Sequence, residues 1–106
     1  MKILYVDDDP EDRDIFCDAL HTINPGIECT LAFNGAEALV RLTRERLPDY
    51  IFLDINMPIM TGKECLKVLK QTPRFASIPV IIYSTSNSER DIKECSELGA
   101  IHNWGR

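Results

Sequence analysis

The sequence is short of positive charge and of long apolar runs. Its 106 residues carry 12 Lys and Arg against 17 Asp and Glu, which gives a net charge of -5. A phosphate-binding surface needs clustered basic residues, and the lack of a strong cluster argues against a nucleic-acid partner. No stretch approaches membrane-spanning length, and the N-terminal apolar run ends in acid, unlike a signal peptide. We therefore expect a cytoplasmic chain, away from membranes, whose partners are proteins or cations.

Paired cysteines are also lacking. The four cysteines are widely spaced and include no CxxC pair. This spacing supports neither a zinc knuckle nor a redox motif. The pattern predicts four free thiols in a reducing cytoplasm, at Cys17, Cys29, Cys65 and Cys95.

What the chain does contain is a regular alternation of strand and helix patterns. Its length and its hydrophobic content of 44% suit one domain with a modest core. Each short apolar run is typical of a buried strand and is followed by apolar residues at helical spacing. The runs occupy residues 3–6, 27–33, 50–53 and 79–83. This alternation predicts an α/β fold, a doubly wound parallel sheet with helices on both faces.

Polar residues follow three of these runs. Asp7, Asp8 and Asp9 come directly after the first run, Asp54 after the third and Ser84 after the fourth. Asp9 precedes a proline and is predicted to cap the next helix. Functional residues of a parallel sheet gather at the carboxyl ends of its strands. If the first, third and fourth strands are near neighbours, the other four side chains share one pocket.

Carboxylates gathered in a partly dry pocket limit what it can hold. They repel one another unless they raise their pKa values, stay hydrated or share a cation. Mg²⁺ prefers oxygen ligands and commonly takes one or two carboxylates together with a phosphate oxygen. A carboxylate such as Asp54 can then act as a nucleophile and become an aspartyl phosphate. The pattern therefore favours a Mg²⁺ site beside a phosphoryl acceptor.

Four motifs, in this order, carry a resemblance to a known family. They are VDDDP at 6–10, IFLDINMP at 51–58, MTG at 60–62 and PVIIYST at 79–85. Together they resemble the receiver domain of bacterial two-component response regulators. The resemblance implies a flavodoxin-like sheet of strand order 2-1-3-4-5 and a signalling role without enzyme activity. It also implies a sensor histidine kinase or phosphotransfer protein as phosphodonor, and a downstream protein partner.

The same resemblance implies roles for individual residues. Asp54 stands where the family has its phosphoryl acceptor. Asp7 and Asp8 match the acidic pair that holds Mg²⁺ with Asp54 and the backbone carbonyl of Asn56. Ser84 matches the switch hydroxyl that moves toward the phosphoryl group.

The resemblance weakens at the C-terminus. Receivers have a fifth strand that ends in lysine, and then a fifth helix. Here residues 99–106 read GAIHNWGR, with Arg106 where the lysine belongs. We therefore expect one receiver domain at 1–106, incomplete at its C-terminus, with an atypical fifth strand and no fifth helix. Apolar surface left uncovered predicts marginal stability or self-association into a homo-oligomer.

Other functions stay open at this point. A receiver-like module that binds partners but no longer switches is motivated by Arg106. An aspartyl phosphatase of the haloacid dehalogenase type needs a second aspartate where this chain has Asn56. A flavin carrier needs a first loop that cradles phosphate, which three adjacent aspartates repel. The phospho-accepting receiver is the reading that we prefer.

Overall fold

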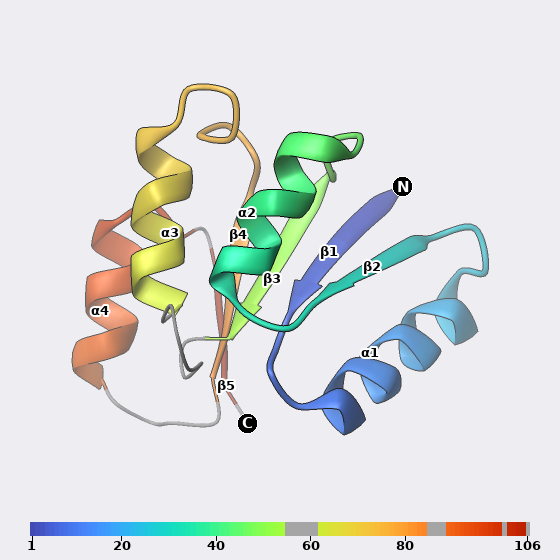
Figure 1. Ribbon diagram of the computed structural model, residues 1–106. Helices are drawn as coiled ribbons and strands as arrows, with labels where there is room; N and C mark the ends of the chain where they lie inside the picture. Colours follow the sequence, from blue (N-terminus) through green and yellow to red (C-terminus); the bar gives the residue numbers. More distant parts are fainter. Residues whose placement is uncertain (55–61, 85–88, 101, 106) are drawn as a thin grey trace.

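The computed structural model describes residues 1–54, 62–84, 89–100 and 102–105, with side chains described at 1–54, 62–82 and 93–100. Strands and helices alternate along it, as Figure 1 shows. No helix in these ranges is long and apolar enough to cross a membrane. The elements are β1 (Lys2–Val6), α1 (Pro10–Ile23), β2 (Glu28–Ala32), α2 (Gly35–Arg44), β3 (Tyr50–Asp54), α3 (Gly62–Gln71), β4 (Val80–Ser84), α4 (Glu89–Glu97) and β5 (His102–Gly105).

The strands form one parallel sheet in the order β2-β1-β3-β4-β5. This confirms the α/β prediction and the strand order that the resemblance implies. β1 lies between β2 and β3, and β3 lies between β1 and β4. The carboxyl ends of β1, β3 and β4 are therefore adjacent, which was the condition for a shared pocket.

Helices cover the two faces of the sheet unequally. Figure 1 shows α2, α3 and α4 on one side of the sheet and α1 on the other. The larger core lies under α2, α3 and α4 and includes Leu53, Leu66 and Ile82. The smaller core is built from Ile3, Tyr5, Ile27 and Phe52, with Phe16 and Leu20 of α1 packed against it. Residues 7–9, which include the acidic residues, connect the carboxyl end of β1 to the helix that covers this face of the sheet.

Asp9 begins α1, as predicted. Its side chain accepts a hydrogen bond from the backbone N–H of Glu11 at 2.9 Å, and its carbonyl accepts one from the N–H of Arg13 at 3.1 Å. Proline follows the cap, where its missing N–H costs the helix no hydrogen bond. This cap fixes the direction in which the chain leaves β1.

The prediction of four free thiols was wrong for two cysteines. Cys17 of α1 and Cys29 of β2 form a disulfide, with their Cα atoms 6.0 Å apart. Residue spacing could not show this, because the contact arises from packing α1 beside β2 rather than from a short motif. Cys65 and Cys95 are free thiols, as predicted, and both are buried. The disulfide therefore joins α1 to an edge strand of the sheet.

Candidate functional site

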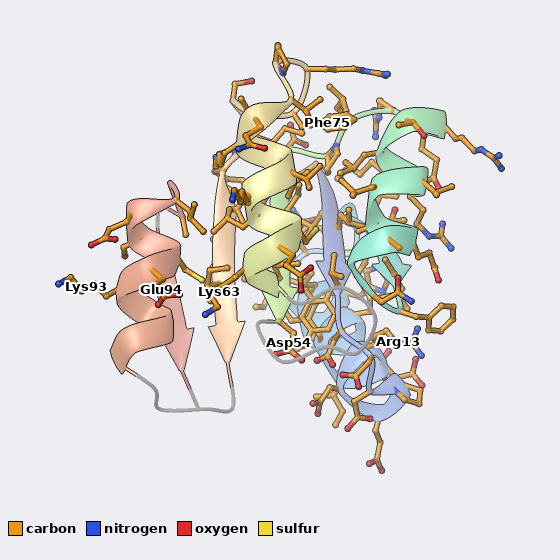
Figure 2. All side chains as sticks on the ribbon, turned by 60° about the vertical axis from the view of Figure 1, so that its left-hand side comes forward. Arg13, Asp54, Lys63, Phe75, Lys93 and Glu94 are labelled. Carbon is orange, nitrogen blue, oxygen red and sulfur yellow. A yellow bond between two sulfur atoms is a disulfide. The ribbon has the colours of Figure 1, made fainter. Side chains whose placement is uncertain are left out.

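Three of the predicted site residues meet at one edge of the sheet. Carboxylate oxygens of Asp7, Asp8 and Asp54 all lie within 4.8 Å of one another. Asp54 is the last residue of β3, and Asp7 and Asp8 follow β1, whose Val6 pairs with Leu53. Adjacent parallel strands thus place residues 47 positions apart in sequence at one site. Figure 2 labels Asp54 at the end of its strand.

Burial makes the charge of this cluster costly. Asp7 is 2% exposed and Asp54 7% exposed, whereas Asp8 is exposed. Burial raises the pKa of Asp7; hydrogen bonds from the Asp9 N–H and the Tyr5 hydroxyl oppose the rise, and the charges of Asp12 and Asp8 add to it. A cation held among these carboxylates would offset the repulsion.

The donor atoms fit a magnesium ion. Mg²⁺ prefers oxygen ligands, and three carboxylate oxygens, one from each aspartate, lie within 4.8 Å of one another. Asp7 accepts one hydrogen bond at each oxygen, at Oδ1 from the Asp9 N–H (3.0 Å) and at Oδ2 from the Tyr5 hydroxyl (2.9 Å). Each oxygen keeps a lone pair, because a carboxylate has about four acceptor positions. The exposed position of Asp8 leaves room for the waters that Mg²⁺ retains.

The remaining predicted residues are placed only in part. Ser84 ends β4 and pairs with Gly105, one position beyond the pairing of Asp54 with Tyr83. Its backbone therefore reaches the same edge of the sheet as Asp54, while its side chain lies outside the described residues. Asn56 and Arg106 lie outside them altogether. The roles of Ser84 and Asn56 stay predictions, as do those of the three clustered aspartates.

Sequence reasoning missed the support that Tyr5 gives to the cluster. Its hydroxyl donates to Asp7, and its ring stacks on Phe16 of α1 with centroids 4.0 Å apart. A signal was available, because residues two apart in a strand point to the same face and Tyr5 precedes Asp7 by two. The tyrosine in the otherwise aliphatic run at 3–6 is the residue that carries this signal.

Sequence reasoning also missed the burial of Arg13 and its contact with an aromatic ring. Arg13 is 6% exposed, and its guanidinium carbon lies 3.8 Å from the ring centroid of Phe33, which follows β2. Within the described part of the chain, its Nε has no hydrogen-bond partner. Figure 2 labels Arg13 near the carboxyl end of the sheet. This contact joins the start of α1 to the segment that enters α2.

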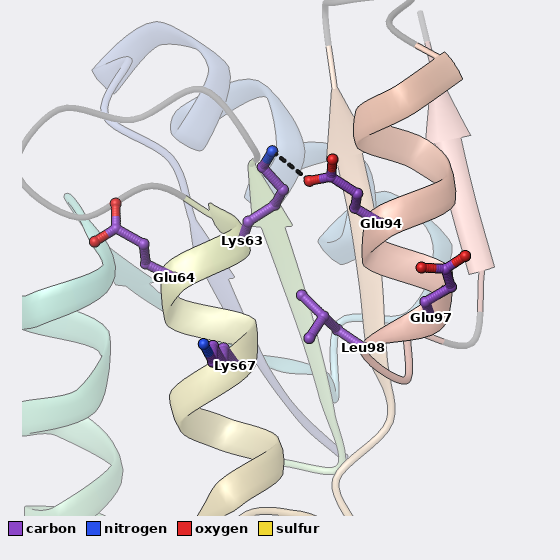
Figure 3. A pocket seen from close by; sticks show the side chains of 6 residues that line it. All are labelled: Lys63, Glu64, Lys67, Glu94, Glu97 and Leu98. Carbon is purple, nitrogen blue, oxygen red and sulfur yellow. Dashed lines mark hydrogen bonds and ion pairs between the residues drawn. The ribbon is translucent and has the colours of Figure 1, made fainter.

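A cavity of about 360 Å³ lies away from the acidic cluster, between α3 and α4. Figure 3 shows Leu98 facing it and Lys63 reaching Glu94 across it, at 2.7 Å. Lys67 and Glu97 add further charge to its two walls. Among the residues whose side chains the structure describes, no predicted site residue lines this cavity, so the acidic cluster remains the candidate site.

The family model for the response regulator receiver domain matches residues 3–102. The chain belongs to this family. The receiver is 40% identical over 105 residues to a protein-glutamate methylesterase/protein-glutamine glutaminase of Clostridium acetobutylicum, covering 95% of the receiver but 29% of that relative. It is 37% identical over 98 residues to the two-component response regulator ORR13 of Oryza sativa subsp. japonica, covering 92% and 79%. The receiver thus spans less than a third of its methylesterase relatives.

Solved structures agree with this membership. The Mn²⁺-bound form of the response regulator Rcp1 superposes with a TM-score of 0.91 at 29% identity, covering 98% of the receiver and 79% of that chain. The fold is therefore the flavodoxin-like receiver fold that the motifs implied.

Proposed function

We propose that the receiver accepts a phosphoryl group on Asp54 and passes the signal on by protein contact. The observation that carries this proposal is the cluster of Asp54 with Asp7 and Asp8 at the carboxyl edge of the sheet. Membership of the receiver family supports a phospho-accepting role in two-component signalling. The remaining details are inferences from the chemistry of this cluster.

The proposed transfer forms one bond and breaks one. An Oδ atom of Asp54 attacks the phosphorus of a phosphohistidine on a sensor kinase or phosphotransfer protein. The P–N bond breaks, its electron pair stays on the imidazole nitrogen, and that nitrogen takes up a proton. The acceptor becomes an aspartyl phosphate. The nucleophile is the carboxylate form of Asp54, which has no proton to give up, so the step needs no general base.

Mg²⁺ is the cofactor that the cluster suits, with Asp7, Asp8, Asp54 and the carbonyl of Asn56 as its proposed ligands. When bound, it offsets negative charge on the carboxylates and on the transferred phosphoryl group. The protein contributes by holding the carboxylates together before the phosphoryl group arrives. Asp7 does so from a buried position with both oxygens hydrogen-bonded.

Signalling follows from the new charge. We propose that the phosphoryl group draws the Ser84 hydroxyl toward it and shifts the surface around α4 between two states. A downstream protein that binds one state better would then read the signal. The proposed partners are therefore a phosphodonor protein and a downstream protein. Self-association into a homo-oligomer is part of the same proposal.

The proposal takes residues 1–106 as one receiver unit that acts in the cytoplasm. The Cys17–Cys29 disulfide is unusual for this location, because the cytosol keeps most thiols reduced. A module that binds without switching remains the second candidate. It predicts little phosphorylation-dependent change in partner affinity.

The first test is intact mass after incubation with acetyl phosphate, with and without Mg²⁺. We expect one Mg²⁺-dependent phosphoryl adduct on the wild-type chain and none on Asp54→Asn, which keeps the shape of the side chain. Asp14→Asn is the matched control, since Asp14 is exposed on α1. Circular dichroism would first establish that all three chains are folded.

The possible results separate the candidates. Equal adducts on wild type and Asp54→Asn would reject Asp54 as the acceptor. An adduct that forms equally without Mg²⁺ would reject the proposed cofactor. A folded wild-type chain that gains no adduct would leave the binding module as the better interpretation.

A further inference from the structure

Tyr5 is nearly fully buried, yet it carries a hydroxyl. It is 1% exposed, and its ring belongs to the smaller core with Ile3 and Phe52. A buried tyrosine hydroxyl needs a hydrogen-bond partner to offset its desolvation. That partner is Oδ2 of Asp7, at 2.9 Å. Phenylalanine would fill the same apolar space without this requirement, so packing alone does not explain the hydroxyl.

Both oxygens of the Asp7 carboxylate accept a hydrogen bond, and the Tyr5 hydroxyl is the donor to one of them. Oδ1 of Asp7 accepts the backbone N–H of Asp9, the residue that caps α1. With Oδ2 on Tyr5, rotation of the carboxylate plane would break at least one of the two bonds. Asp7 is thus held in one orientation before any ligand arrives.

The donor itself has little freedom. The Tyr5 ring lies against Phe16 of α1 at an interplanar angle of 12°. Phe16 in turn contacts Phe52 of β3, with ring centroids 4.9 Å apart. The next residue along α1 is Cys17, which is joined to β2 by the disulfide. The hydroxyl is therefore carried on a ring that two strands and a helix hold in place.

We propose that Tyr5 is a positioning residue for cation binding, acting through Asp7. Its hydroxyl orients the Asp7 carboxylate so that the remaining lone pairs are available to an ion shared with Asp8 and Asp54. This inference rests on the proposed function, which makes that cluster the cation site. Tyr5 does not touch the ion or the phosphoryl group.

The expected effect is on cation affinity. Residues that hold metal ligands in orientation typically change metal affinity by about 10- to 100-fold when they are mutated. We expect Tyr5→Phe to weaken Mn²⁺ binding by about 10-fold, because the ring stays and only the hydroxyl is lost. Tyr50→Phe is the matched control. Tyr50 is the first residue of β3, at the amino end of the strand that carries Asp54 at its carboxyl end. The same chemical change there should leave the Mn²⁺ affinity within about 2-fold.

The experiment is a Mn²⁺ titration followed by the electron paramagnetic resonance of the free ion. It uses wild type, Tyr5→Phe, Tyr50→Phe, Tyr5→Leu and Asp8→Asn, at a temperature well below every metal-free melting temperature. Weak binding by Tyr5→Phe with normal binding by Tyr50→Phe supports the positioning role. Tyr5→Phe equal to wild type, with only Tyr5→Leu impaired, would show that the ring alone matters and would overturn it.

Asp8→Asn distinguishes failure of the inference from failure of the site. If Asp8→Asn binds Mn²⁺ like wild type, or wild type does not bind it, the proposed cation site is wrong and the inference falls with it. If Asp8→Asn is impaired and Tyr5→Phe is not, the site stands and the positioning role is rejected.

A second measurement decides the question if Tyr5→Phe does not fold. The chain has three tyrosines, so Tyr5 is the last one left in the Tyr50→Phe, Tyr83→Phe double variant. Adding Mg²⁺ should then shift the tyrosine near-ultraviolet absorption, since the hydroxyl bonds a ligand of the ion. No shift at saturating Mg²⁺ would overturn the proposal.

Discussion

Phe16 of α1 stacks on Tyr5 of β1, with ring centroids 4.0 Å apart and ring planes 12° from parallel. Figure 1 shows α1 on the opposite side of the sheet from the other helices. In the described part of the chain this face of the sheet has α1 as its helical cover, so the aromatic stack is central to the smaller core. The stability of that core should therefore depend on Phe16.

Phe16→Ala should lower the free energy of unfolding by about 2 kcal/mol, because it removes a half-buried ring and its two aromatic contacts. Urea denaturation followed by circular dichroism measures this loss. Ile15→Ala is the control on the neighbouring position, where the side chain is 60% exposed and the change should stay within about 0.5 kcal/mol. Equal losses in both variants would contradict the packing described for α1.

Arg13 and Phe33 should be energetically coupled. The guanidinium is buried against the ring, and such cation–π contacts contribute about 0.5 to 2 kcal/mol depending on desolvation. A double-mutant cycle with Arg13→Met and Phe33→Leu, read by urea denaturation, should give a coupling of about 1 kcal/mol. A coupling near zero would mean that the contact contributes no stability. Arg13→Met alone should cost little, since it also removes the Nε that has no hydrogen-bond partner among the described residues.

Asp7 should make stability depend on pH in a defined direction. Its pKa is raised above 3.8 in the folded chain, mainly by burial, so the folded state binds this proton more tightly than the unfolded state does. The stability that Asp7 contributes is therefore present below 3.8 and is lost as the pH rises through the folded pKa. In metal-free buffer at neutral pH, Asp7→Asn should be more stable than wild type, and the gain should shrink as the pH falls toward 3.8.

Thermal melts across this pH range test the prediction, with Asp14→Asn as the exposed control. Adding Mg²⁺ should stabilise wild type more than Asp7→Asn, because ligand binding to the folded state stabilises it by mass action. A wild-type chain that is more stable than Asp7→Asn without metal would show that the hydrogen bonds to Asp7 outweigh its burial.

Thiol counting tests the disulfide. Denatured without reductant, the chain should react with two equivalents of a thiol reagent, and after reduction with four. The folded chain should react slowly, because burial raises the pKa of the Cys65 thiol to about 12 and Cys95 is also buried. Reduction should lower the free energy of unfolding by about 2 to 3 kcal/mol for a loop of this length. Four reactive thiols before reduction would contradict the Cys17–Cys29 bond.

Local patterns were sufficient to predict most of the fold. The apolar runs at 3–6 and 50–53 became β1 and β3 with boundaries changed by one residue, because a strand buried on both faces has no polar positions inside it. The start of α1 could be predicted from Asp9 and the proline after it, because capping involves only residues within the first turn of the helix. The meeting of Asp7 with Asp54 followed from the strand order rather than from either motif alone.

The contacts between α1 and the sheet could not be predicted, because residue spacing in the sequence does not encode them. The Cys17–Cys29 bond, the Tyr5–Asp7 hydrogen bond and the stack on Phe16 all need the position of α1 relative to the sheet. A period of 3.6 residues tells which side of α1 is apolar, but not how far along a strand the helix sits. These contacts were therefore found only in three dimensions.

The disulfide also bears on the order in which the molecule opens. β2 is an edge strand, and edge strands commonly exchange their amide protons early because one side is unpaired. Here β2 cannot leave β1 without drawing α1 with it, since Cys29 and Cys17 are joined. The segment from β1 to β2 should thus behave as one cooperative unit, and opening should begin at β5, which among the described strands pairs with β4 alone.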